Sequence, residues 1–169
     1  MIFRVFFSLT LFSSLVAADT NNSVELLNNA LTQNYSFVER SLSKSDLKIE
    51  ESAGEILFND PGFVVNITSP FKERYEVNED IITIHDIDLE QSRKIKVADV
   101  QSIFLNILLN GLKTASDIYL IKENDYPNFL VVPLDDSPAI NFIFNKNNLS
   151  LIRYTDSLGI EHGIELTKL

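Results

Sequence analysis

Few side chains in this sequence could do chemistry. The 169-residue chain has no cysteine and two histidines, and its nearest candidate metal-binding groups are the stretch His85–Asp88 and the pair Glu161–His162. Neighbouring residues on a strand point to opposite faces, so His85 and Asp86 cannot grip one ion together. The sequence therefore lacks the cluster of His, Cys and carboxylate side chains that a zinc or redox site needs, and we expect no metal and no cofactor.

Hydrolytic chemistry has equally little support. No Gly-x-Ser-x-Gly turn is present, and the five glycines are scattered singly, so there is no glycine-rich phosphate loop. Acidic residues cluster at turns such as Asn124-Asp125 and Asp135-Asp136, where solvated charge is the ordinary explanation. We expect a protein that is not an enzyme, and a hydrolase of unknown type is the third of three hypotheses.

The first 18 residues have the pattern of a secretory signal peptide. Arg4 is followed by an uncharged stretch from Val5 to Ala18, which ends in small residues. That stretch is shorter than the roughly 18 to 20 residues that span a bilayer, and no later segment could span one as a helix. We expect cleavage near Ala18, export to the periplasm, and a single domain over residues 19–169 without a transmembrane segment.

The charge balance restricts the partners. The formal net charge is −10 at pH 7, so nucleic acid and anionic lipid surfaces should repel the protein at long range. A basic surface on a partner would attract it. We expect a monomer that binds no nucleic acid.

Two stretches have the periodicity of amphipathic helices. In residues 19–36, Val24, Leu27 and Leu31 fall at i, i+3 and i+7, and Ser23 is placed to cap the start. The second stretch, residues 97–114, has one wide apolar face, with Asp99 as its expected cap and Gly111 at its expected end.

The rest of the chain consists of short apolar runs separated by turn residues, which is typical of consecutive antiparallel strands. We expect eleven strands, at 35–42, 54–59, 62–68, 72–77, 80–85, 91–96, 116–122, 128–133, 138–145, 148–155 and 160–168. A sheet of this size tends to curl. The predicted fold class is mainly β with two helices (α+β): a strongly curved antiparallel sheet that forms an incomplete barrel.

Several of these strands are apolar on both faces. In GEILFNDPGFVVNITSP, residues 54–70, three apolar residues run together on each side of the turn. Two short helices are too few to cover the inside of a curled sheet of this size. The sequence thus predicts an apolar cavity, and an apolar hollow in an exported protein suggests an apolar ligand.

Two blocks of residues resemble the family of the periplasmic outer-membrane lipoprotein carrier protein LolA. The first block reads Gly54, Asp60-Pro61, Phe63, Val65, Ile67 and Pro70, where the family shows a Gly-led strand, a basic residue with Pro, a Phe, alternating apolar residues and a Pro. The second is IHDIDLEQ at 84–91, in which His85 replaces the usual aromatic residue. Asp60 stands at the family's basic position. An aspartate accepts hydrogen bonds but does not donate them, so the lid must be latched differently.

The resemblance implies a half-barrel whose helices form a lid over an apolar cavity. It implies a carrier that binds the acyl chains of lipoproteins and moves them from an inner-membrane exporter to an outer-membrane receptor. The residues expected to contact lipid share an apolar character and a place on the strands or the second helix: Leu57, Phe63, Val65, Ile67, Ile84, Phe104, Ile107, Leu108, Phe142 and Phe144.

Two other interpretations remain open. Six of these residues are equally well explained as plain core: Phe63, Val65, Ile67, Phe104, Ile107 and Leu108. In that case the protein is an exported structural or protein-interaction domain with a self-filled interior. The same cavity would also suit a carrier of other apolar ligands.

Overall fold

The structure is a computed structural model that describes residues 16–43, 45, 47–59, 61–100, 102–124, 127–135 and 137–169. Residues 1–15 of the expected signal peptide and the expected latch position Asp60 lie outside the described residues. The described part contains eleven strands, two α-helices and one 3-10 helix. Their bounds are α1 Val16–Ala30, β1 Tyr35–Ser43, β2 Lys48–Phe58, β3 Phe63–Ser69, β4 Glu73–Val77, β5 Ile81–Asp86, β6 Gln91–Lys96, η1 Val97–Asp99, α2 Ile103–Asn110, β7 Tyr119–Glu123, β8 Phe129–Pro133, β9 Ile140–Asn145, β10 Asn148–Thr155 and β11 Glu161–Lys168.

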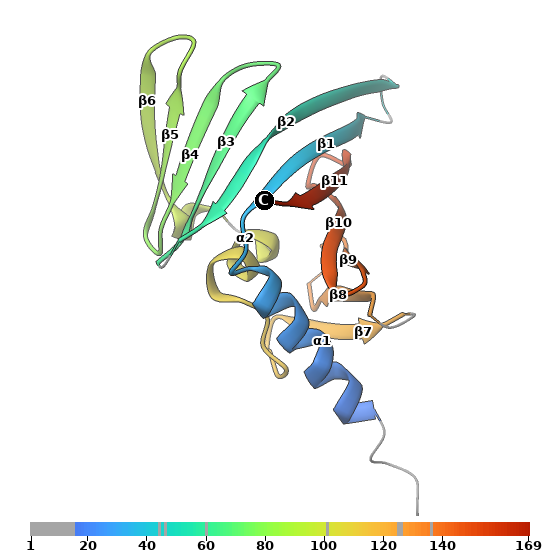
Figure 1. The fold of residues 1–169 in the computed structure, drawn as a ribbon. Helices are drawn as coiled ribbons and strands as arrows, with labels where there is room; N and C mark the ends of the chain where they lie inside the picture. The colour runs from blue at the N-terminus through green and yellow to red at the C-terminus, as the bar shows by residue number, and fades with distance from the viewer. Residues whose placement is uncertain are drawn as a thin grey trace, which may run out of the picture.

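The strands form one sheet in the order β6-β5-β4-β3-β2-β1-β11-β10-β9-β8-β7. All neighbouring strands are antiparallel. Strands β1 to β6 follow one another in the sheet, and so do β7 to β11. The two groups are joined where β1 pairs with the last strand, β11, from Tyr35 opposite Lys168 to Leu42 opposite Glu161. The edge strands β6 and β7 are not paired with each other, so the sheet is an open half-barrel. Figure 1 shows it curling around α2, with α1 along the β7 to β10 half. The predicted fold class is confirmed.

The turn residues define the strand ends. Lys146 and Asn147 both have positive φ, 49° and 66°, and they form the two-residue connection between β9 and β10. All eleven expected strands exist, and β2 and β7 differ most from their expected bounds. β2 begins at Lys48 rather than residue 54, because residues 48–53 pair fully with β1 although they are mostly polar and exposed. β7 begins at Tyr119 rather than residue 116.

Both helices exist, but the expected caps at Ser23 and Asp99 are wrong. Ser23 lies within α1, where it is buried and its hydroxyl donates to Glu123 Oε1 at 2.6 Å. The second stretch is divided, because Val100 is extended between η1 and α2. Ser102 caps α2 by accepting from the backbone N–H of Leu105. Gly111 ends α2 as predicted, with φ 71°.

The interior has two apolar clusters. One lies between α1 and the β7 to β10 half and includes Leu27, Phe129 and Phe142, all with 0% exposure. The other lies between α2 and strands β3 to β5, around Phe63 and Ile82. Side chains of α2 pack against both clusters, so this eight-residue helix joins the two halves of the molecule.

Candidate functional site

An apolar cavity of ≈ 140 Å³ lies between the sheet and the two helices, where the two clusters meet. It is bounded by the central strands β1, β2 and β11, with contributions from β3, β10, α2 and the residue that follows α1. Its lining residues are apolar with one exception, a glutamate: Leu31, Tyr35, Phe37, Glu39, Ile56, Phe58, Val65, Phe104, Leu108, Leu149, Ile152, Ile164 and Leu166.

The pleat of the strands and the pitch of α2 explain this lining. Tyr35, Phe37 and Glu39 alternate along β1, so all three point to the concave face. The same spacing places Ile56 and Phe58 of β2 there. On α2, residues four apart share a face, and Phe104 and Leu108 close the cavity from the helix side.

The volume limits what this arrangement holds. An apolar cavity of about 150 Å³ stays dry and takes a benzene-sized molecule. The present cavity is of that size, so it accepts a short apolar group while both helices stay in place. A whole acyl chain requires α2 or its neighbours to move outward.

Three of the ten residues expected to contact lipid line the cavity: Val65, Phe104 and Leu108. The others fall into two groups. Five are core residues with at most 7% exposure, which belong to the two clusters and not to the lining: Phe63, Ile84, Ile107, Phe142 and Phe144.

The remaining two expected residues, Leu57 and Ile67, lie elsewhere on the sheet. Leu57 alternates with Ile56 and Phe58, so its side chain is on the opposite, convex face. Ile67 shares the face of Val65 but lies beyond it on β3, outside the lining.

Sequence reasoning missed most of the lining on the central strands. Tyr35, Phe37, Ile56 and Phe58 have the alternation that could have identified them. Ile164 and Leu166 are different, since they reach the cavity only because β11 pairs with β1.

One end of the cavity is polar. Glu39 Oε1 lies 2.7 Å from His162 Nδ1, and Glu39 Oε2 accepts from the Ser52 hydroxyl at 3.2 Å. On the other side of the imidazole, Nε2 lies 3.5 Å from Asp156 Oδ2. The side chain of His162 is 15% exposed and that of Glu39 is 26% exposed. A carboxylate only accepts, so Nδ1 carries the proton in the contact with Glu39.

Ring stacking connects this polar end to α2. The His162 ring stacks on Tyr154 with centroids 4.6 Å apart, and Tyr154 stacks on Phe104 of α2 at 4.9 Å. Burial raises the pKa of the Tyr154 hydroxyl, and the charges of Glu39 and Asp156 raise it further. Two carboxylates, Glu39 and Asp156, thus lie at this end of the cavity.

Asn28 holds the two helices together. Its Nδ2 donates to the backbone oxygen of Leu112 at 3.0 Å, and its Oδ1 accepts from the N–H of Leu112 at 2.7 Å. Because Leu112 follows α2 directly after Gly111, this two-point contact ties α1 to the end of α2. We call this contact the latch between the helices.

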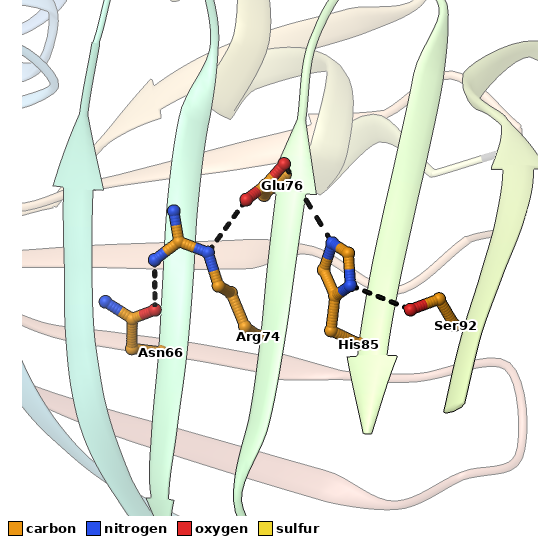
Figure 2. A network of polar contacts seen from close by, with 5 residues as sticks. All are labelled: Asn66, Arg74, Glu76, His85 and Ser92. Atoms are coloured by element: carbon orange, nitrogen blue, oxygen red, sulfur yellow. Dashed lines mark hydrogen bonds and ion pairs between the residues drawn. The ribbon is translucent and has the colours of Figure 1, made fainter. Parts of the chain in front are cut away.

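The remaining histidine lies on the convex face. Figure 2 shows a row across β3 to β6, in which Arg74 donates to Asn66 Oδ1 and Glu76 Oε1, and His85 Nδ1 lies 2.8 Å from Ser92 Oγ. The hydrogen bond from Arg74 lowers the pKa of Glu76. Asn66 neighbours the lining residue Val65, so the row is on the other side of the sheet from the cavity.

The described part of the chain has neither a metal-binding cluster nor a membrane-spanning helix. Within the ranges given above, no group of three His, Cys, Asp or Glu side chains could hold a metal ion. None of the helices described is both long enough and apolar enough to cross a membrane.

Comparison with known proteins confirms the resemblance at the level of the fold. No protein-family model matches the sequence, and no curated protein does. Among solved structures, a LolA superfamily protein from Nitrosomonas europaea aligns with a TM-score of 0.52 and 10% identity over 88% of this chain and 91% of that chain. This chain has a LolA-like fold. An uncharacterized conserved protein from Thermus thermophilus aligns with a TM-score of 0.50 and 10% identity over 88% and 84% of the two chains.

Proposed function

We propose that this protein is a carrier that binds the acyl chains of lipoproteins in the cavity beneath α2. The observation that carries the proposal is the apolar cavity itself, which lies between a LolA-like half-barrel and its helices. Burial of an acyl chain contributes about 0.8 kcal/mol per methylene group, so even a partly buried chain would be held firmly.

For a whole acyl chain to enter, the helix that closes the cavity would have to move outward. α2 has eight residues, the extended Val100 precedes it and Gly111 follows it. Its lining side chains, Phe104 and Leu108, meet the sheet through apolar contacts and ring stacking rather than through ion pairs. Such contacts are non-directional, so an incoming chain would replace them with similar ones.

The location and the partners are part of the same proposal. The signal-peptide pattern of residues 1–18 supports export to the periplasm. There the carrier would receive lipoproteins from an inner-membrane exporter and deliver them to an outer-membrane receptor. The catalytic inventory of the sequence supports a function in binding rather than in catalysis.

The second candidate is an exported structural or protein-interaction domain whose interior is filled by its own side chains. The small volume of the cavity, ≈ 140 Å³, favours it. The two candidates differ in whether the interior takes up an acyl chain.

Neighbouring residues of β2 provide a matched test. Ile56 lines the cavity, and Leu57 points to the convex face. Ile56→Trp should block the cavity and lower the affinity for a fluorescent palmitoyl monoglyceride by about tenfold or more, because overpacking excludes the chain. Leu57→Trp should bind like the wild type.

Val65→Phe is a second blocking variant, in case Ile56→Trp fails to fold, and Val64→Phe on the convex face is its control. Circular dichroism checks that each variant is folded. If the wild-type protein takes up no monoglyceride, or if the convex-face variants lose binding as strongly as the cavity variants, the carrier proposal is wrong.

A further inference from the structure

The polar end of the cavity holds one carboxylate that a purely apolar pocket would not need. Among the described lining residues, Glu39 alone carries a charge at neutral pH. It follows Tyr35 and Phe37 on the same face of β1. On the neighbouring strands, Ser52 and Ile164 lie opposite it.

Glu39 marks a boundary on the concave face. Towards the helices, the positions of β1 and β2 on this face are apolar: Tyr35, Phe37, Ile56 and Phe58. Away from the helices, the same face continues with Ser41 and Ser43 of β1 and with Ser52, Glu50 and Lys48 of β2. A ligand whose apolar chain occupies the cavity would therefore have its polar end at the level of Glu39.

The groups at this boundary accept hydrogen bonds and carry negative charge. Glu39 and Asp156 lie on the two sides of the His162 ring. The nearest arginine along β1, Arg40, points to the other face, where it pairs with Glu51 and Glu165. Burial raises the pKa of the Tyr154 hydroxyl most, and the charges of both carboxylates raise it further.

We infer that Glu39, together with His162, is the recognition site for the polar end of the ligand. The site favours an acyl chain whose head is uncharged or cationic and donates hydrogen bonds, and it disfavours a free fatty acid. A carboxylate head would lie against Glu39, and juxtaposed like charges are strongly unfavourable. This inference rests on the proposed function and specifies its ligand class.

Three probes with the same chain and different heads test the inference on the wild-type protein: palmitoyl monoglyceride, hexadecylamine and palmitate. Each displaces a phenylnaphthylamine dye from the protein at neutral pH and low salt. The monoglyceride and the amine should bind about tenfold or more tighter than palmitate.

Two variants test whether the preference against palmitate comes from Glu39. Glu39→Gln should tighten palmitate binding relative to monoglyceride binding by about fivefold or more, because the amide removes the charge that repels a carboxylate head. Glu55→Gln removes the same charge from an exposed position on the convex face of β2, and it should change neither.

These measurements distinguish failure of the recognition site from failure of the carrier function. If palmitate binds the wild-type protein as tightly as the monoglyceride does, or if Glu39→Gln leaves the preference unchanged, the recognition site is refuted while the carrier stands. If neither the dye nor any of the three probes binds, the carrier and the recognition site are both refuted.

Discussion

At Gly54, β2 lies close to the backbone of β3. A Cβ atom at this position would lie 2.0 Å from the backbone oxygen of Asn66, which cannot move without β3. We predict that Gly54→Ala lowers the free energy of unfolding by about 3 kcal/mol, as severe overpacking does. Urea denaturation monitored by circular dichroism measures this change in the free energy of unfolding.

Gly163 of β11 is the matched control, since a Cβ there would lie 3.9 Å from the Arg40 oxygen, an ordinary contact. Gly163→Ala should change the free energy of unfolding by less than about 1 kcal/mol. Equal effects at the two glycines would contradict the close approach of β2 and β3.

Asp156 gives a pH dependence whose sign follows from its contacts. Burial alone would raise the pKa of its carboxyl, but hydrogen bonds from the N–H groups of Ile160 and Leu158, and the nearby His162, lower it below the ordinary value of 3.8. A folded-state pKa below the unfolded one means that the charged form stabilises the fold above the unfolded pKa. This contribution is lost as the pH falls through the folded pKa.

We therefore predict that, when the pH is lowered from about 6 to about 3, the free energy of unfolding falls less for Asp156→Asn than for the wild type. The amide keeps an acceptor for both N–H groups, so the variant remains folded. Asp117→Asn, at an exposed position, is the control and should follow the wild-type profile. Denaturant midpoints at several pH values measure the difference, and a wild-type profile for Asp156→Asn would contradict the assignment.

At the scale of elements, the contact between α1 and the end of α2 depends on one side chain. Asn28 makes two hydrogen bonds to the backbone of Leu112. We predict that Asn28→Ala lowers the free energy of unfolding by about 2 kcal/mol, because it leaves both backbone groups of Leu112 without their partner. Amide hydrogen exchange should become faster across residues 103–112.

Asn29→Ala is the control for this prediction, because Asn29 is the next residue of α1 and is exposed. It should leave the exchange of α2 unchanged. If Asn28→Ala also leaves that exchange unchanged, the latch between the helices is not what holds α2 in place.

The elements themselves were largely predictable because their signals are local. Turn residues such as Lys146 and Asn147 separate the strands, and the stripe of Val24, Leu27 and Leu31 defines the buried face of α1. The caps were not predictable. Ser23 has the residue type of a cap, but its hydroxyl is taken by Glu123, 100 residues away.

At the scale of the whole molecule, the position of the cavity depends on pairing between distant segments. β1 lies between β2 and β11, and residues from all three strands line the cavity. The sequence indicated an excess of apolar surface, and Val65, Phe104 and Leu108 are the expected residues that line the cavity. It could not indicate Ile164 or Leu166, because no local pattern encodes the register of the first strand against the last.

The same distant pairing assembles the polar end of the site. Glu39 and His162 are 123 residues apart in the sequence, and they meet only because β1 and β11 are neighbours. In the sequence, His162 stood out only with its neighbour Glu161 as a weak metal-binding candidate, and Glu39 did not stand out. The structure makes them the boundary between an apolar cavity and a polar concave face.

Photoaffinity labelling tests directly whether an acyl chain occupies the cavity between the sheet and the helices. A palmitoyl monoglyceride with a diazirine at the end of its chain is bound, irradiated and located by mass spectrometry. If the acyl chain enters the cavity, the label lies on cavity residues such as Phe37, Ile56 and Ile164. A label found only on convex-face residues such as Val64, or no label at all on folded protein, would contradict it.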